Sequence, residues 1–374
     1  MLSWPFKQSA SNPRYTAIGL MSGTSLDALD AALVQETEVG QVTVLHTDTV
    51  EFPAELKQRL EELVVSGHTA LSDLLQIEHH YTELVVMQCQ RLIALSSTAV
   101  DVIGFHGQTI WHAPAIGSTM QIGHAEWLAE NTQVPVVAQF RRGDMARGGQ
   151  GAPLAPLFHA AHFGRETEAV AVLNLGGIAN LTLLYPGQSP VGWDLGPANT
   201  LSDQWFYQHH GRPFDANGAF ASTGQAHPDL LDQLLSDPYF KAPPPKSTGR
   251  EHFNLAWLAN YSEHFSDLHP ADIQATLNQL TARLVSKALP DDIELLVVCG
   301  GGVRNSHLMD CIDAAVDALM VTSDTFDIDP LAVESACFAW LAIQRLRGVT
   351  PDVRALTGAK RNGLLGHLYL PTRD

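Results

Sequence analysis

The sequence has no long apolar run, no paired cysteines and few basic residues. No stretch of about 20 apolar residues could span a membrane, and residues 1–12 lack the apolar core of a signal peptide. The four cysteines, Cys89, Cys299, Cys311 and Cys337, include no C-x-x-C pair, so neither a zinc site nor a disulfide framework is predicted. We therefore expect a cytoplasmic protein in a reducing compartment.

Basic residues are scarce, with 22 Lys and Arg against 40 Asp and Glu and a formal net charge of −18 in 374 residues. Such a field repels nucleic acid and anionic membranes, so we expect no partner of either class. A phosphate ligand would have to be held locally, by backbone N–H groups and a few placed cations. The length predicts two domains. The oligomeric state is left open, a homodimer included.

Two common nucleotide-binding motifs are also missing. Lys246-Ser247-Thr248 follows three prolines instead of a glycine loop, so it is not a P-loop. The glycine turn at 299–305 follows a buried strand at 295–298, but Asn305 stands where a dinucleotide-binding fingerprint has its last glycine.

The sequence instead contains a repeated hairpin pattern. Apolar runs flank a small, polar turn at 21–27, and the pattern returns around the turn at 174–180. This repeat predicts an α/β chain with two similar lobes, each opening with a hairpin whose tip faces a common cleft. We place the lobes at 1–165 and 166–344, with 345–374 packing back on the first. Helices are predicted at 54–65, 72–96, 271–288, 306–320 and 332–346.

Three glycine turns in this order suggest a phosphate clamp, because glycine lets backbone N–H groups approach phosphate oxygens. The alternative is that all three are only tight turns. Asp194, which precedes a Gly-Pro pair, could act as a general base. From the residues alone, an Asx turn or a cap on the helix expected from Thr200 is favoured over this role.

Several other polar residues are candidates for a sugar site. His106 and Gln108 are predicted to lie in a loop after a strand at 100–103, where they could bond sugar hydroxyls, although a satisfied loop histidine is also consistent. Arg141 and Asp144 lie in a glycine-rich segment that is either a substrate loop or a lobe hinge.

Two further features have a simpler explanation than ligand binding. Glu334 stands near the start of the helix predicted at 332–346, where the helix N-terminus alone would favour a carboxylate. His159 and His162 are three residues apart on a predicted helix, but no third ligand is evident, so packing is favoured over a metal site.

Six segments resemble, in family order, the anhydro-N-acetylmuramic acid kinases. They extend from residue 19 to beyond residue 300. The segments are Gly19-Leu-Met-Ser-Gly-Thr-Ser-Leu-Asp27, Phe105-His-Gly-Gln-Thr109, Gly148-Gly-Gln-Gly-Ala-Pro-Leu154, Asn174-Leu-Gly-Gly177, Pro243-Pro-Pro-Lys-Ser-Thr-Gly-Arg-Glu251 and Cys299-Gly-Gly-Gly302.

The resemblance implies the two-lobed actin/hexokinase-like fold, a duplicated ribonuclease H-like fold. It also implies an ATP- and Mg²⁺-dependent kinase of cell-wall recycling. Such an enzyme opens the anhydro bridge of 1,6-anhydro-N-acetylmuramic acid with water and phosphorylates O6, giving N-acetylmuramic acid 6-phosphate.

Its catalytic base would be Asp194. The residues expected to bind the nucleotide are Gly23, Thr24, Ser25, Leu26, Asp27, Ala28, Leu29, Asp30, Asn174, Gly176, Gly177, Gly300, Gly301, Gly302 and Asn305. Those expected to bind the sugar are His106, Gln108, Arg141, Asp144 and Glu334, whereas no metal ligand is assigned.

The sequence departs from the family pattern at three positions. Ala28 and Ala198 replace glycines, and Gln139 replaces an aspartate. Ala198 lies four residues from the expected base, and a positive φ there would cost about 1–2 kcal/mol of strain; we expect a negative φ. Two rival functions remain open: a related sugar kinase with another acceptor, and a nucleotide-binding sensor without catalysis. A metallohydrolase has no supporting ligand set.

Overall fold

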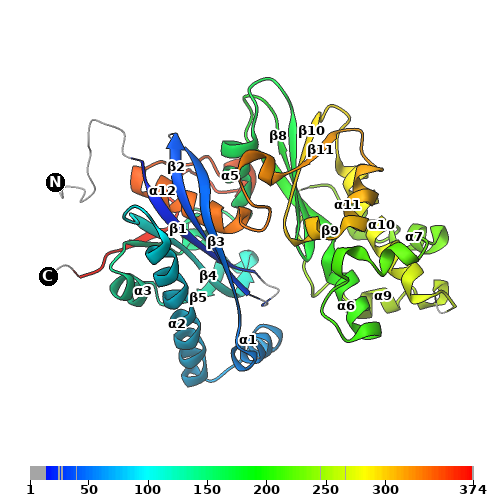
Figure 1. The fold of residues 1–374 in the computed structure, drawn as a ribbon, viewed down its shortest axis with the longest axis horizontal. Helices are drawn as coiled ribbons and strands as arrows, with labels where there is room; N and C mark the ends of the chain where they lie inside the picture. Colours follow the sequence, from blue (N-terminus) through cyan, green and yellow to red (C-terminus); the bar gives the residue numbers. More distant parts are fainter. Residues whose placement is uncertain are drawn as a thin grey trace. The chain divides into compact units, whose positions relative to one another are not determined.

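The computed structural model describes residues 14–23, 26, 28–38, 40–244, 246–265 and 267–372. The chain divides into two compact units, which are described separately. Unit 1 comprises Met1–His162 and Ala332–Asp374, and unit 2 comprises Phe163–Leu331. Each unit contains one sheet and several helices (Figure 1). Within the described residues, no helix is both long and apolar enough to cross a membrane.

Unit 1 is built on a seven-stranded sheet with the order β12-β6-β4-β1-β2-β3, and β5 pairs with β4 outside this path. Its strands are β1 (Thr16–Ser22), β2 (Ala28–Glu38), β3 (Gln41–Glu51), β4 (Val102–Ala113), β5 (Ser118–Ile122), β6 (Val136–Ala138) and β12 (His367–Tyr369). Its helices are α1 (Ala54–Ser66), α2 (Leu71–Leu95), α3 (Ala125–Thr132), α4 (Phe140–Met145), α5 (Ala155–Phe163, ending at the unit boundary), α12 (Val333–Arg347) and α13 (Arg354–Thr357).

The central strand β1 presents large apolar side chains on one face of the sheet and a glycine on the other. Ile18 and Leu20 are fully buried in a core with α1, α2 and α3, as the period of two in a strand requires. Gly19, between them, faces α12: a Cβ there would lie 1.8 Å from the Ser335 carbonyl oxygen. Gly104 is its register partner on β4, and a Cβ there would lie 2.0 Å from a backbone carbonyl of α12. Both positions require glycine for the helix to touch the sheet.

This packing explains a difference from the predicted lobe boundary. The sequence placed residues up to 344 in the second lobe, but α12 belongs to unit 1. The helix contacts β1, β2 and β4, and most of its residues are buried. The glycine pair that allows this contact is far from α12 in the chain, so periodicity alone could not assign the helix to a lobe.

Unit 2 is built on a five-stranded sheet with the order β11-β10-β7-β8-β9. Its strands are β7 (Val170–Leu175), β8 (Ile178–Leu184), β9 (Val191–Pro197), β10 (Leu295–Cys299) and β11 (Leu319–Thr322). Its helices are α6 (Asn199–His210), α7 (Pro228–Leu234), α8 (Pro238–Lys241), α9 (Leu255–Ala259), α10 (Pro270–Ala288) and α11 (Ser306–Asp313). Twelve residues of α10 are buried, and several of them join the core of this unit.

The two sheets repeat one topology. In unit 1 the order β3-β2-β1-β4-β6 joins two antiparallel pairs to two parallel ones, and in unit 2 the order β9-β8-β7-β10-β11 does the same. The internal duplication predicted from the two hairpins is confirmed. A pair of such ribonuclease H-like units is the actin/hexokinase-like fold.

Two local predictions were wrong. The predicted helix at 306–320 ends as α11 at Asp313, and the chain then forms β11, which pairs in parallel with β10. The predicted loop at His106 and Gln108 is part of β4, which continues to Ala113 and pairs with β5. In both places strand pairing, which is a tertiary feature, decided the conformation.

Candidate functional site

The tip of the β1–β2 hairpin is partly described. Gly23 follows β1, and its carbonyl accepts hydrogen bonds from the Leu26 amide and from Gln108 Nε2, both at 3.3 Å. Leu26 has a positive φ of 57° and a buried side chain. Three predicted nucleotide ligands lie outside the described residues: Thr24, Ser25 and Asp27.

Gln108 supports this tip from inside. The residue is fully buried, because β4 continues past it and pairs with β5. Its amide nitrogen is shared between the carbonyls of Gly23 and Thr109. The predicted direct contact with a sugar is therefore not supported, and Gln108 positions the tip instead.

The first residues of β2 have different environments. Ala28 is partly exposed at the start of the strand. Leu29 is fully buried, and its carbonyl accepts a hydrogen bond from Gln88 Nε2 at 3.0 Å; its predicted contact with nucleotide is not supported. Asp30 is partly exposed and accepts a hydrogen bond from Thr49 Oγ1 at 2.8 Å. Of these three residues, only Asp30 carries an ionisable side chain.

His106 and Arg141 form a fixed pair in unit 1. Arg141 Nε donates to His106 Nε2 at 2.9 Å, and His106 Nδ1 lies 2.6 Å from the Gly107 carbonyl. Since Nε2 must accept, the proton is on Nδ1 and the ring is neutral. Burial, and then the Arg141 charge, lower the pKa of His106 well below its ordinary value. Arg141 Nη1 also donates to the Gly151 carbonyl at 2.9 Å, so the guanidinium is held from two sides.

Glu334 lies in the first turn of α12, near Arg141 and Asp30. Its side chain is exposed, yet the surrounding protein displaces enough water to raise its pKa. The negative charge of Asp30 adds to this rise, and the positive charge of Arg141 opposes it. The tertiary structure thus brings two carboxylates, a cation and a neutral imidazole from four separate elements into one half-site.

Asp144 has a structural role instead of the predicted sugar contact. It is fully buried in α4. Its Oδ2 accepts from the Gly151 amide at 2.8 Å, and its Oδ1 accepts from Thr357 Oγ1 at 2.9 Å. A Cβ at Gly149 would lie 2.2 Å from Oδ2. Asp144 therefore shapes the glycine-rich loop that supplies the Gly151 carbonyl to Arg141.

In unit 2, a row of polar side chains crosses the sheet. Asn174 on β7, Asn180 on β8 and Asp194 on β9 are successive register partners. Asn174 Nδ2 donates to Asn180 Oδ1 at 3.5 Å, and Asn180 Nδ2 donates to Asp194 Oδ1. Cys299 on β10 extends the row and lies 3.9 Å from Asn174 Oδ1. Every amide in the row points its donor toward the carboxylate of Asp194.

A chain segment beside β9 fixes the rest of Asp194. The Thr248 amide donates to Asp194 Oδ2 at 2.9 Å, and the Asp194 amide donates to the Lys246 carbonyl at 3.2 Å. Tyr239 OH donates to the Asp194 carbonyl at 2.9 Å. Both carboxylate oxygens and both backbone polar groups are therefore held, and the residue is neither an Asx turn nor a helix cap.

The surroundings of Asp194 favour a basic carboxylate. Burial raises its pKa, the donors Thr248 and Asn180 lower it, and the charge of Glu251 raises it, with a net rise. The residue nevertheless keeps contact with solvent. A partly exposed carboxylate with a raised pKa can take a proton from a bound water.

Two glycine turns in unit 2 lie against each other. Gly176 and Gly177 join β7 to β8, and Gly300 follows β10 with a φ of 85°. A Cβ at Gly300 would lie 2.8 Å from the Leu175 carbonyl oxygen, and one at Gly302 would lie 2.5 Å from Leu175 Cβ.

Gly301, the middle residue of the second turn, has nothing within 4 Å of a built Cβ and is exposed. Since β7 and β10 are parallel, these turns lie at the carboxyl ends of their strands, the edge where open α/β sheets bind ligands. Backbone this accessible fits a phosphate chain.

Asn305 acts as a helix cap through its side chain. Its Oδ1 accepts from the Leu308 amide at 3.0 Å and caps α11. A Cβ at Gly218 would lie 2.2 Å from this oxygen. Asn305 therefore ties the second glycine turn to the helix that follows it.

The three departures from the family pattern have different consequences. Ala198 has φ −115° and lies in the core of unit 2, so the expected negative φ is confirmed and the methyl group does not sit on a left-handed backbone. Ala28 simply begins β2. Gln139 adopts φ 61° before α4, and its buried Oε1 has no hydrogen-bond partner in the described part of the chain.

The described residues contain no cluster of metal-ligating side chains. No group of three or more His, Cys, Asp or Glu side chains that could hold a metal occurs among the described residues. His162 Nε2 accepts from the Val42 amide at 2.9 Å. Burial lowers the pKa of His162 to about 4 and that of His159 to about 3, so both are neutral packing residues.

Sequence comparison identifies the family. Residues 15–371 match the family model described as "Anhydro-N-acetylmuramic acid kinase". The chain belongs to the anhydro-N-acetylmuramic acid kinase family. It is 43% identical over 368 residues to the anhydro-N-acetylmuramic acid kinase of Pasteurella multocida, covering 96% of this chain and 97% of the relative. It is also 43% identical over 359 residues to that of Pseudomonas putida, covering 94% and 98%.

Among solved structures, it is similar to a ROK family glucokinase from Streptomyces griseus in complex with glucose and AMPPNP. That match has a TM-score of 0.40 and 15% identity, and covers 88% of this chain and 99% of the other.

For this anhydro-N-acetylmuramic acid kinase family member, sequence reasoning missed the residues that hold Asp194. Asn180 and Thr248 lie in segments that carry the family resemblance or adjoin it, but neither was assigned to the site. An amide side chain at 180 in a largely apolar strand was the available signal. The donor at 248 is a backbone amide and has no side-chain signature.

Proposed function

We propose that this chain uses ATP and water to open the anhydro bridge of 1,6-anhydro-N-acetylmuramic acid and phosphorylates O6, giving N-acetylmuramic acid 6-phosphate. The observation that carries the proposal is the environment of Asp194. Its carboxylate is partly exposed and raised in pKa, and both of its oxygens accept hydrogen bonds. An immobile carboxylate with raised basicity is what activation of a water requires.

The proposed reaction has a balanced sequence of bond changes. Asp194 accepts a proton from water while the water oxygen bonds to C1 of the sugar. The bond between C1 and O6 breaks, and its electron pair passes to O6. O6 then bonds to the γ-phosphorus of ATP, and the bond from that phosphorus to the bridging oxygen breaks to release ADP. The base is needed for the first bond only, so nucleotide binding does not depend on it.

The half-site in unit 1 is proposed to bind the sugar. Muramic acid carries a lactyl carboxylate, and Arg141 is a fixed cation in a chain of net charge −18. Neutral His106 orients the guanidinium without adding a competing charge. Glu334 is suited to accept hydrogen bonds from sugar hydroxyls, and the positive charge of Arg141 opposes the burial and the Asp30 charge that raise its pKa.

The glycine turns are proposed to hold the nucleotide. Gly176, Gly177 and Gly301 of unit 2 offer accessible backbone for this role. Mg²⁺, when bound with ATP, would neutralise charge on the transferring phosphoryl group. Mg²⁺ commonly binds through one or two carboxylates and the substrate phosphates, so the lack of a three-residue cage in the described residues is compatible with it; Asp30 is the described carboxylate proposed for this role. The cytoplasm, where ATP is plentiful, is the proposed location.

Mass spectrometry of the product in ¹⁸O-labelled water tests the proposal. The full chain is incubated with 1,6-anhydro-N-acetylmuramic acid, ATP and Mg²⁺. The product should carry one phosphate and one ¹⁸O atom at C1. N-acetylmuramic acid 6-phosphate, kept in the same water for the same time, corrects for spontaneous exchange at C1.

The rival functions give other results. A kinase that phosphorylates a free hydroxyl would yield a phosphorylated sugar that still contains the anhydro bridge and lacks the added oxygen. A nucleotide-binding sensor would bind ATP and yield no phosphorylated sugar. Either result would overturn the proposed hydrolytic step.

A further inference from the structure

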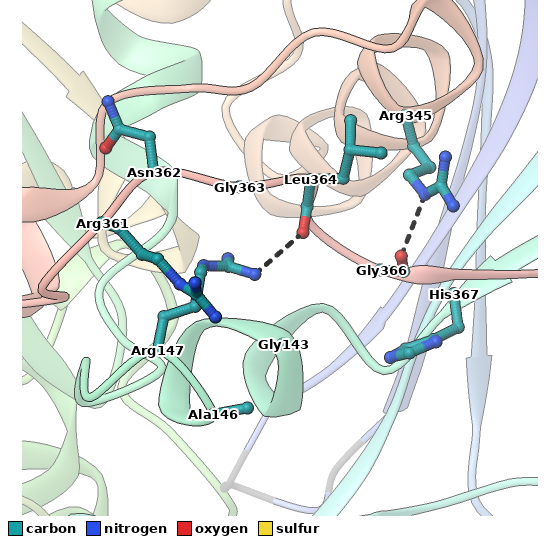
Figure 2. A pocket seen from close by; sticks show the side chains of 10 residues that line it. All are labelled: Gly143, Ala146, Arg147, Arg345, Arg361, Asn362, Gly363, Leu364, Gly366 and His367. Atoms are coloured by element: carbon teal, nitrogen blue, oxygen red, sulfur yellow. Dashed lines mark hydrogen bonds between the residues drawn. The ribbon is translucent and has the colours of Figure 1, made fainter.

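A cavity of about 540 Å³ lies within unit 1, between α4 and the chain's C-terminal segment (Figure 2). None of its lining residues is among those assigned above to the nucleotide or the sugar. We call it the arginine cavity. It is lined by Gly143, Ala146, Arg147, Arg345, Arg361, Asn362, Gly363, Leu364, Gly366 and His367.

The ionisable side chains that line the arginine cavity are basic. Three arginines and one histidine line it, and none of the described carboxylates does. A second hollow shares Arg147 and Arg361 with it and adds Lys360. This gathering of cations occurs in a chain with only 22 basic residues against 40 acidic ones. Like charges held together repel one another unless an anion compensates them.

Two of the arginines are held in place by backbone carbonyls. Arg147 Nη1 donates to the Leu364 carbonyl at 3.3 Å, and Arg345 Nε donates to the Gly366 carbonyl at 3.0 Å (Figure 2). Gly363 lies so close to the guanidinium of Arg147 that a Cβ would be 2.8 Å from Nη1. For Arg147, a carbonyl orients the guanidinium but does not neutralise its charge.

Two hydrogen-bond donors of Arg147 have no acceptor among the described residues. Arg147 Nε and Nη2 are buried and have no hydrogen-bond partner within the described part of the chain. These two nitrogens form one edge of the guanidinium, which is the edge that binds an oxyanion through two parallel bonds. Arg361 is exposed, and no hydrogen bond or ion pair involves it among the described residues. An oxyanion would supply the acceptors that both side chains lack.

We propose that the arginine cavity binds a phosphate group, either as free phosphate or as part of a small phosphate monoester. A dianion with several acceptor oxygens compensates more than one guanidinium at once, which a single carboxylate does less well. The volume is in the range of small-molecule sites and exceeds what one phosphate fills. This site is separate from the proposed kinase site and does not depend on it.

Calorimetric titration of the full chain tests this site with two probes, inorganic phosphate and glucose 6-phosphate. A non-hydrolysable ATP analogue and Mg²⁺ are kept at saturation. The proposed nucleotide site is then filled, so the probes cannot bind there. Arg361→Gln removes one cation from an exposed position and should fold normally. Arg361→Glu reverses the charge, and Arg59→Gln is the matched control on α1, outside the cavity.

We expect saturable binding of at least one probe by the unaltered chain. Arg361→Gln should weaken it about tenfold, Arg361→Glu should weaken it further, and Arg59→Gln should leave it unchanged. Tighter binding of the ester would identify a phosphate monoester as the ligand, and equal binding would identify free phosphate. No saturable binding of either probe, or equal affinities in the unaltered chain and both Arg361 variants, would overturn the proposal.

Discussion

Asn180 donates a hydrogen bond to Asp194 from the position directly opposite it on the neighbouring strand. Asn180 is in turn the register partner of Asn174, which donates to it. The sheet therefore fixes one carboxylate oxygen of the proposed base, and the Thr248 amide fixes the other. These two donors also lower the pKa of Asp194, whereas burial raises it, with a net rise.

Asp194→Asn should separate chemistry from stability. The amide keeps the shape and removes the base, so turnover should fall by about 10²–10⁴-fold while ATP affinity is retained. Burial raises the pKa of Asp194 in the folded state. The folded chain then binds its proton more tightly than the unfolded chain, and the charged form costs stability above that pKa. The amide, however, sets its NH2 group against one of the two donors, Asn180 Nδ2 or the Thr248 amide, which offsets this gain, so the melting temperature at neutral pH should change little. Near-normal turnover would contradict the assigned base.

Asn180→Ala should move the acid limb of the pH–rate profile. The Asn180 donor favours the charged carboxylate and lowers the pKa of Asp194. Removing it raises that pKa further, so the pH at which activity is half lost on acidification should rise. Thr182→Val, two residues along the same strand, is the matched control and should leave this pH unchanged. A limb that stays in place in Asn180→Ala would show that Asn180 does not act through the base.

Ala198→Gly should have little effect on turnover. The native φ of −115° is negative, so alanine does not hold a left-handed backbone that glycine would relieve. We expect turnover within about threefold of the unaltered chain, a barrier change under about 0.7 kcal/mol. The methyl group is buried in the core, so the melting temperature should fall slightly. A tenfold gain in turnover would mean that the alanine displaces Asp194.

Gly104→Ala should destabilise unit 1. The added Cβ would lie 2.0 Å from the Phe338 carbonyl oxygen, and backbone there has no room to move without lifting α12 from the sheet. We expect a loss of about 3 kcal/mol in the free energy of unfolding, measured by denaturant titration. Gly143→Ala in α4 is the control, since its Cβ would lie 3.6 Å from the nearest atom and alanine favours a helix. Equal stability of the two variants would contradict the close approach of α12.

Much of the fold could be predicted from the sequence because its signals are local. Apolar runs around small, polar turns predicted both hairpins, and their repetition predicted the duplicated sheets. Helical periodicity located α1, α2, α10 and α12 to within one or two residues. The negative φ at Ala198 was also expected, since Pro197 restricts the turn beside it.

The functional roles of several residues depended on burial, which no local pattern reports. Gln108, Leu29 and Asp144 carry the right chemistry or lie in the right segment for ligand contact. All three are fully buried, and each serves the framework of unit 1. A strand that continues, a core that closes over a side chain and a loop that folds onto a carboxylate are outcomes of packing.

The order of residues is enough to predict the repeated strand pattern, the glycine turns and Asp194 as the residue to test. What holds that carboxylate depends on contacts between distant segments. Asn180 and Thr248 are 14 and 54 residues from it in the chain. Strand register and the position of a loop beside an edge strand bring them within hydrogen-bonding distance. Register is a property of paired strands and not of either strand alone, so it is fixed when the sheet forms.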